Sequence, residues 1–301
     1  MSAKPPQDRA RQSVAAAAVA AELLPGQSPA LLQELHLLTR SGELNADARR
    51  KLKQINHLYG MLRPKLEPLL ANHGDPLLLD AGAGNGYLGF VLYDLLLRPA
   101  GRGRLVGVES RPDLVERVNQ RAALLGFSRL QALQGQLAEW ADADVAGIDG
   151  QKPQAVLALH ACDTATDDAL VLGIRAESQV IAVVPCCQAE LARLLGGGSA
   201  VRSALGPLWR HPFHRREFGA HLTNVVRSLV LEAHGYSVAV TELTGWEHSM
   251  KNELILAHKV QRSNGLALQQ LRGLLAELPV GEMGLLRRLA ATLAPAAAPA
   301  P

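Results

Sequence analysis

A run of small residues, Asp80-Ala81-Gly82-Ala83-Gly84-Asn85-Gly86, follows a short apolar stretch and precedes a helical pattern. Glycine has no Cβ, so it permits a tight turn and lets a ligand approach the backbone closely. The dinucleotide-binding fingerprint G-x-G-x-x-G is one loop of this kind. Tyr87 occupies the place of its third glycine. The run therefore predicts a cofactor loop, and Tyr87 disfavours a dinucleotide.

Two carboxylates, Asp80 and Glu109, each come directly after a short apolar stretch. These positions suit a cationic cofactor. S-adenosylmethionine (SAM) has a sulfonium and an ammonium group that suit Asp80, and ribose hydroxyls that Glu109 can hold by two hydrogen bonds. Gln136 and the backbone of Leu137 are candidates for adenine contact. A turn cap at Asp80, a solvated Glu109 and a simple turn at Gln136 are the alternatives. The expected cofactor residues are Asp80, Gly82, Gly84, Asn85, Gly86, Glu109, Gln136 and Leu137.

Candidate catalytic residues follow two later apolar stretches, with His160 and Asp163 after one and Cys186 and Cys187 after the other. His160 is a possible general base, and Asp163 could orient it or hold the methyl acceptor. A thiolate nucleophile is a further possibility. Alternatively the histidine and cysteines are structural and Asp163 caps a helix, since positioning alone can drive methyl transfer. Adjacent cysteines chelate zinc poorly, so no metal is expected.

A basic and aromatic segment at 209–216 supplies Arg210, Arg215 and Arg216 as candidate substrate-binding residues. Cations interleaved with aromatic rings suit phosphate contact and base stacking, which favours RNA. Lys251 and Asn252, ahead of the last apolar stretch, are further candidates. The alternatives are a loop with solvated charges at 209–216 and a plain turn at 251–252.

Short apolar stretches alternate with helical patterns from residue 76 onward, which predicts a parallel sheet with helices on both faces. The expected strands are 76–79, 104–108, 130–133, 155–159, 180–184, 236–243 and 253–260, and the expected helices are 87–97, 112–125, 166–172 and 221–234. The last two strands have no helix between them, so the last one runs antiparallel. The fold class is α/β, a doubly wound, mostly parallel seven-stranded sheet with an antiparallel last strand. This is the class I methyltransferase architecture, here with an N-terminal helical extension.

Four segments are expected: a flexible lead-in at 1–28, a helical extension at 29–72, a methyltransferase domain at 73–262, and a helical tail at 263–301 that ends in a disordered Ala/Pro run. Asn45 could cap a helix in the extension, and Pro64 is expected to end it. The extension either caps the main domain or shares in substrate binding.

The bulk composition limits partners and location. The chain has 301 residues, 48% hydrophobic content and a formal charge of +3, which is far from that of a nucleic-acid coat. Three cysteines, two of them adjacent, favour reduced thiols and a cytoplasmic location. The Ala-rich run at 14–21 is interrupted by Glu22 and is not a signal peptide. No apolar stretch reaches the ~20 residues of a membrane span, and the oligomeric state stays open.

The cofactor loop, His160-Ala161-Cys162, Pro185-Cys186-Cys187 and Lys251-Asn252 occur in this order. They resemble the methyltransferase domain shared by methyltransferase-like 25 proteins and glutathione S-transferase C-terminal-domain-containing proteins. The resemblance implies a SAM-binding fold, with Asp80, Gly82, Gly84 and Glu109 in cofactor roles, in a family often assigned provisionally to RNA. Asp163 departs from the glycine common at its position. The Asn/Asp-Pro-Pro-Tyr motif is lacking, so methylation of an adenine amino group is not supported.

The sequence therefore predicts a SAM-dependent methyltransferase whose preferred acceptor is RNA. A methyltransferase for a small molecule or a protein side chain is the first alternative, with segment 209–216 as a lid. A non-catalytic SAM-binding interaction module is the second. The intact glycine loop and Glu109 disfavour that second alternative.

Overall fold

The computed structural model describes residues 19–142, 148–159, 161, 163–185, 188–197, 202–243, 253–278 and 283–293. Seven strands form one sheet in the order β3-β2-β1-β4-β5-β7-β6. They are β1 (Leu77–Ala81), β2 (Arg104–Glu109), β3 (Leu130–Gln134), β4 (Ala155–Ala158), β5 (Val180–Val183), β6 (Tyr236–Glu242) and β7 (Glu253–Lys259). The helices are α2 (Pro29–Glu34), α3 (Ala46–Asn72), α4 (Tyr87–Leu92), the π-helix η1 (Tyr93–Leu97), α5 (Arg98–Ala100), α6 (Pro112–Leu124), α7 (Leu137–Asp142), α8 (Thr164–Arg175), α9 (Glu190–Leu194), the 3₁₀-helix η2 (Gly206–Leu208), α11 (Pro212–Ala233), α12 (Gly265–Glu277), α13 (Gly284–Arg288) and α14 (Ala290–Leu293).

Strand pairing confirms the expected sheet. β1 lies between β2 and β4 and is parallel to both, and β3 and β5 extend the parallel part on either side. β7 is antiparallel to both β5 and β6, as expected for a last strand that follows without a helix. The strand order reverses between β1 and β4, so ligands are expected beyond the carboxyl ends of these two strands.

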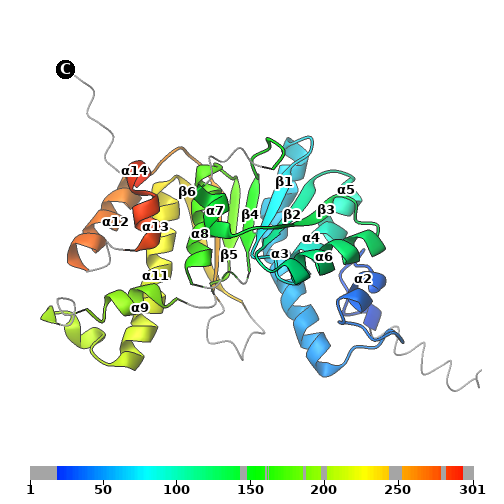
Figure 1. Cartoon of the computed structure of the whole chain (residues 1–301), viewed down its shortest axis with the longest axis horizontal. Coiled ribbons are helices and arrows are strands. Elements are labelled where there is room, and N and C mark those ends of the chain that lie inside the picture. Colours follow the sequence, from blue (N-terminus) through cyan, green and yellow to red (C-terminus); the bar gives the residue numbers. More distant parts are fainter. Residues whose placement is uncertain are drawn as a thin grey trace, which may run out of the picture.

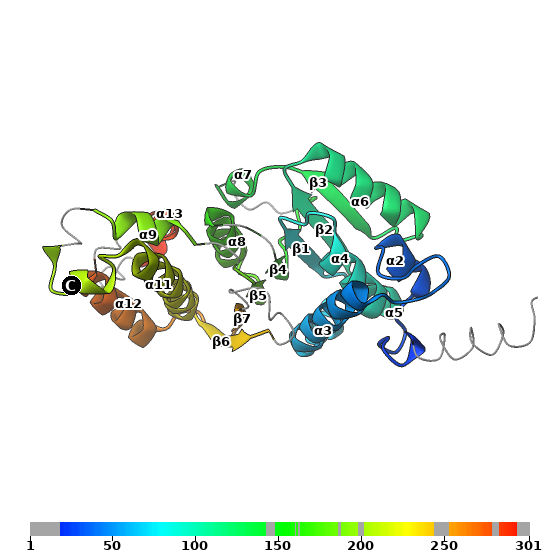
Figure 2. The same ribbon diagram turned by 90° about the horizontal axis from the view of Figure 1, so that it is seen from below.

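Alternate residues of each strand enter two separate hydrophobic cores, one on each face of the sheet. Leu77 and Leu79 of β1 pack with α8, α11 and α13 on one face. Leu78 packs with α3, α4 and α6 on the other. Figures 1 and 2 show α2 and α3 at one end of the molecule and α9 and α12 at the other, with the sheet between them. The doubly wound arrangement is thus confirmed, while the four segment boundaries stay predictions.

The expectation that Pro64 ends its helix is wrong, because α3 runs from Ala46 to Asn72 through Pro64 and Pro68. Proline inside a helix costs about 3 kcal/mol. Leucines on both sides of the prolines are almost wholly buried, and each contributes about 1.5–3 kcal/mol. They are Leu52, Leu58, Leu62, Leu66 and Leu69. The apolar stripe thus offsets the cost of the prolines.

Helix α11 begins at Pro212, well before the expected start at residue 221. Pro212 stands at the first helical turn, where a missing N–H costs nothing. Trp209, just before it, is fully buried, and its ring lies 5.5 Å from the ring of Phe218. Segment 209–216, for which a loop was one alternative, is therefore anchored to the core by Trp209, and Arg215 and Arg216 lie on a helix.

No helix in the part of the chain that the structure describes is long and apolar enough to cross a membrane. Among the same residues, no group of three or more His, Cys, Asp or Glu side chains is placed to hold a metal ion.

Candidate active site

The glycine loop folds into a tight turn at the carboxyl end of β1. Gly82, Gly84 and Gly86 have φ angles of 73°, 58° and 75°, a region that favours glycine. The amides of Gly82 and Ala83 donate to the carbonyl of Val108 at 2.9 and 3.1 Å, which ties the loop to β2. Tyr87 begins α4, and its hydroxyl donates to the carbonyl of Leu35 in the extension. A glycine at the same position could not make this contact.

Asp80 is buried beside the loop, with only 3% of its surface exposed. Burial raises the pKa of its carboxyl to about 7, an amide hydrogen bond from Gly89 opposes the shift, and the charge of Glu109 adds to it. A buried carboxyl with such a pKa gains from a cation placed against it. Asp80 therefore suits the positively charged part of a ligand.

Glu109, at the carboxyl end of β2, is held by donors on several sides. Its carboxylate accepts hydrogen bonds from the amides of Gly84 (2.9 Å) and Arg111 (3.1 Å), and from Nε of Arg111 (2.9 Å). Burial raises the pKa of Glu109, but these hydrogen bonds and the guanidinium of Arg111 outweigh it, so the pKa is lowered. Glu109 thus stays ionised and can accept from ligand hydroxyls.

Two cavities meet at the loop, and both are lined by Gly82, Gly84 and Arg111. The first, of about 480 Å³, is also lined by Leu37, Lys51, Gln54, Ile55, Leu58, Asp80, Ala83, Asn85, Tyr87, Leu88 and Leu159. The second, of about 330 Å³, is also lined by Val108, Glu109, Ser110, Gly135, Gln136, Leu137, Ala138, Ala161, Ala165 and Asp168. The structure thus brings the expected cofactor residues together, except Gly86, which lines neither cavity.

The residues of α3 that line the first cavity were not anticipated, nor were Arg111 and Asp168. Nothing in the local pattern of α3 distinguishes its cavity face, because tertiary packing of the helix decides which side chains reach the loop. Arg111 had a usable signal, since it follows the carboxylate Glu109 by two residues.

The donor set fits SAM. Asp80 faces the cavity that a cationic end would fill, and Glu109 faces the cavity that also holds Gln136 and Leu137. When bound, SAM supplies a methyl group on a sulfonium that a nucleophilic acceptor atom can take. The residues of this chain bind and orient the cofactor.

Asp163 follows β4 with an unusual backbone, φ 52° and ψ −114°. Its carboxylate caps α9 and not its own helix α8, since it accepts from the amides of Ala189 (2.9 Å) and Glu190 (3.3 Å). Arg193 lies 3.6 Å from the same carboxylate. Asp163 therefore joins the segment after β4 to the segment after β5. Asp163 does not line either cofactor cavity.

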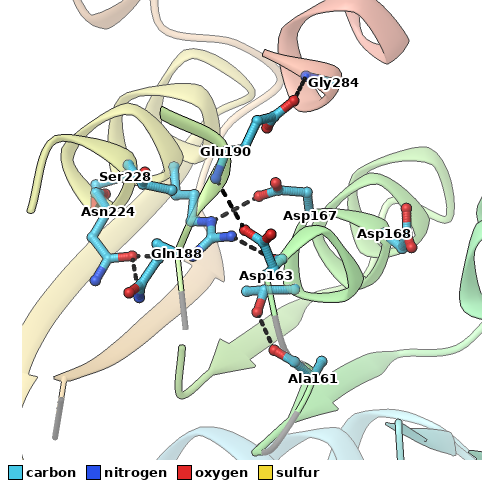
Figure 3. Close-up of polar contacts among 12 residues, drawn as sticks. Ala161, Asp163, Asp167, Asp168, Gln188, Glu190, Asn224, Ser228 and Gly284 are labelled. Atoms are coloured by element: carbon cyan, nitrogen blue, oxygen red, sulfur yellow. Dashed lines mark hydrogen bonds and ion pairs between the residues drawn. The ribbon is translucent and has the colours of Figure 1, made fainter. Parts of the chain in front are cut away.

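Arg227 of α11 is fully buried and lies at the centre of a polar network. Its guanidinium donates to Asp167 Oδ1 at 2.7 Å, to the carbonyl of Asp163 at 2.9 Å and to Asn224 Oδ1 at 3.2 Å. Figure 3 shows Asp163, Asp167 and Asn224 of this network. Asn224 in turn donates to Glu253 at 2.8 Å and accepts from Gln188 at 3.4 Å. One buried cation thus joins the segments after β4 and β5 to α8, α11 and β7. No local pattern in the amino-acid sequence predicts this role of Arg227.

A third cavity, of about 360 Å³, lies beside the end of β5. Three glutamates contribute to its wall, together with His221 and the amides of the network. Its lining is Pro185, Gln188, Glu217, Ala220, His221, Asn224, Val240, Thr241, Glu242 and Glu253. It is a polar recess on the side of the sheet where the catalytic candidates follow β4 and β5.

The basic segment lies at the start of α11. Arg210 and Arg216 are exposed, Arg215 is half-buried, and Phe213 keeps 59% of its surface exposed. The guanidinium of Arg216 lies 5.2 Å from the centre of the Phe213 ring. A cation and an exposed aromatic ring are therefore adjacent on the surface. His160, Cys186, Cys187, Lys251 and Asn252 lie outside the described residues, so their roles stay predictions.

One family comparison agrees with the cofactor assignment. Residues 50–194 match the family described as "Methyltransferase domain". A search of curated proteins finds no match. Among solved structures, a methyltransferase from Podospora anserina with S-adenosylhomocysteine (SAH) bound is 13% identical, covering 87% of this chain and 100% of its own, with a TM-score of 0.43. A geranyl diphosphate methyltransferase is 16% identical, covering 71% and 81%, with a TM-score of 0.45. An rRNA methylase from Streptococcus thermophilus is 13% identical, covering 65% and 94%, with a TM-score of 0.40.

These structural likenesses carry no statement about the acceptor of this chain. The matched family, the sheet order with its antiparallel β7 and the loop with its two carboxylates agree with one another. The chain is a SAM-dependent methyltransferase with the class I fold.

Proposed function

We propose that the methyl acceptor is RNA. The observation that carries this proposal is the exposed Phe213, with the guanidinium of Arg216 beside it, at the start of α11. Arg210, just before the helix, adds a second exposed cation. Guanidinium groups bind phosphates, and an exposed ring can stack on an unpaired base. Further along the same helix, His221 and Asn224 line the cavity beside β5. RNA held at the start of α11 would then have a base within reach of that cavity.

A second candidate is a small molecule or a protein side chain with an amino group. The three glutamates in the wall of the third cavity favour it, because carboxylates accept from ammonium groups and repel phosphates. The two candidates differ at one point. RNA requires the cations at the start of α11, and the amine requires only the recess.

The test measures binding of a fluorescent mixed-sequence RNA oligonucleotide and of SAH. The double variant Arg210→Glu/Arg216→Glu reverses two exposed charges at the start of α11, away from the cofactor loop. We expect RNA affinity to fall by about tenfold or more with a shallower salt dependence, because phosphate contacts release counterions. SAH affinity should not change.

The matched control is Arg102→Glu/Arg262→Glu, which changes the net charge equally at exposed positions next to the starts of β2 and α12. RNA affinity should change little in this control. The identity of the reaction is tested by mass spectrometry of RNA nucleosides from cells lacking the protein, where one methylated nucleoside should be missing. Unchanged RNA together with undiminished RNA binding in the α11 variant would overturn the proposal in favour of the amine acceptor.

We infer further that the chain is related to the methyltransferase-like 25 and glutathione S-transferase C-terminal-domain-containing proteins. The backbone at Asp163 supports this relationship, since its positive φ suits the glycine that is common at that position in those proteins. The substitution Asp163→Gly is therefore expected to be tolerated.

A further inference from the structure

Helix α3 presents cation and amide side chains to the cofactor loop from outside the loop itself. Lys51, Gln54, Ile55 and Leu58 line the same cavity as Asp80. These side chains stand on a fixed support, because Leu52 and Leu58 are almost wholly buried and the Asn45 side chain caps the helix. The extension is therefore positioned to contact whatever fills the cavity.

Two of the described residues that line this cavity have cationic side chains, Lys51 and Arg111. Arg111 donates to the buried carboxylate of Glu109 at 2.9 Å and belongs to the end of the site where the two cavities meet. Lys51 has Asp47 as its partner at 2.8 Å, in a pair whose side chains are 58% and 53% exposed. An exposed pair of this kind contributes little, about 0–1 kcal/mol. Lys51 can therefore exchange Asp47 for a better anion at low cost.

The amino-acid end of SAM carries one positive and one negative group, an ammonium and a carboxylate. Asp80 suits the ammonium, since its buried carboxyl gains from a cation. An anion next to Asp80 and Glu109 needs a cation of its own, because the two carboxylates repel it. Lys51 lines the same cavity as Asp80 and comes from α3, outside the glycine loop.

We propose that Lys51 binds the α-carboxylate of the amino-acid end of SAM, which makes the N-terminal helical extension a part of the cofactor site. This proposal rests on the SAM assignment and is independent of the acceptor. It assigns Asp80, Lys51 and Glu109 to the three polar parts of one ligand: the ammonium, the carboxylate and the ribose.

The test compares two ligands by calorimetry on the full chain: SAH and its decarboxylated analogue, which keeps the ammonium and the adenosine. In Lys51→Met, we expect SAH affinity to fall by about tenfold or more, as for a lost hydrogen bond to a charged group. The affinity for the decarboxylated analogue should stay that of the unaltered protein. The ratio of the two affinities corrects for any general change in folding, which thermal unfolding without ligand also monitors.

Lys53→Met is the matched control, because Lys53 is an exposed lysine on the same helix and does not line the cavity. Neither ligand should change affinity in this control, and Lys51→Arg should recover much of the SAH affinity. Unchanged SAH binding in Lys51→Met would overturn the proposal in favour of loop amides as the carboxylate site. An equal loss for both ligands would overturn it in favour of a role in cavity shape. If the unaltered protein bound neither ligand, the SAM assignment would fall as well, whereas failure of the RNA proposal would leave all these measurements unaffected.

Discussion

At the glycine loop, Asp80 and Glu109 are buried carboxyls that border cavities. Beyond β4 and β5 the buried charge is Arg227, and its guanidinium is enclosed by Asp167, Asn224 and the Asp163 carbonyl. The first region, the cofactor half, keeps polar groups available for a ligand. The second, called the acceptor half after the acceptor site proposed beside β5, uses its buried cation to hold its own segments together. A buried polar group facing a cavity indicates binding, and one facing partners from several elements indicates positioning.

The largest effect is expected in the acceptor half. Arg227→Met leaves the buried Asp167 carboxylate without its cation and removes a partner from Asn224 and from the Asp163 carbonyl. Removing one partner of a buried ion pair lowers the free energy of unfolding by about 3–5 kcal/mol. We expect a loss of unfolding free energy of that size in urea denaturation, with SAH affinity of the folded protein retained.

The double variant Arg227→Met/Asp167→Leu is the control, because it removes both charges and leaves neither unpaired. It should recover most of the lost stability. A loss in the single variant no larger than that of an exposed pair, about 1 kcal/mol or less, would contradict the distinction between the two halves.

The cofactor half should respond to pH instead. The pKa of Asp80 is raised to about 7 by burial, and a cationic ligand favours its ionised form. SAH affinity should therefore fall as the pH drops below about 7, by up to about tenfold per pH unit. The pKa of Glu109 is lowered, so it does not titrate in this window. Calorimetry between about pH 5.5 and 8.5 measures the slope.

Asp80→Asn is the control, since it cannot ionise and should give weaker, nearly pH-independent binding. The folding stability of the protein without ligand should depend on pH in the opposite direction. Because the pKa of Asp80 is raised above its unfolded value of 3.8, its stabilising contribution is complete below that value and is lost as the pH rises through about 7. An SAH affinity that is flat with pH in the unaltered protein would mean that Asp80 does not face the cationic end.

The two halves also differ in how far the sequence predicts them. The glycine loop, Asp80 and Glu109 are local features at strand ends, so their places follow from the strand pattern. Lys51 and Arg227 have no local signal, because the packing of long helices decides which side chain reaches a cavity or a core. The wrong expectation at Pro64 has the same origin, since buried leucines across the whole of α3 outweigh a local rule. Asp163 was a candidate catalytic residue because of its position after β4. Its capping of α9 has no local signal, because it depends on the segment after β5 packing beside the segment after β4.

The smallest effect is expected from the backbone of Asp163, at the edge of the acceptor half. A non-glycine residue with φ 52° and ψ −114° is strained, at a cost of about 1–3 kcal/mol. Asp163→Ala keeps this strain and loses the hydrogen bonds from Ala189 and Glu190, so it should be less stable than the unaltered protein. Asp163→Gly loses the same bonds but relieves the strain.

After the entropic cost of glycine is included, we expect the glycine variant to be about 1 kcal/mol more stable than the alanine variant. Urea denaturation of the two variants side by side measures this difference, and their common loss of the carboxylate cancels. A more stable alanine variant would mean that the strain is absent and that the carboxylate alone explains Asp163. The expected order means instead that the acceptor half keeps a strained residue because its carboxylate joins the segments after β4 and β5, a constraint that the cofactor half avoids by using glycine.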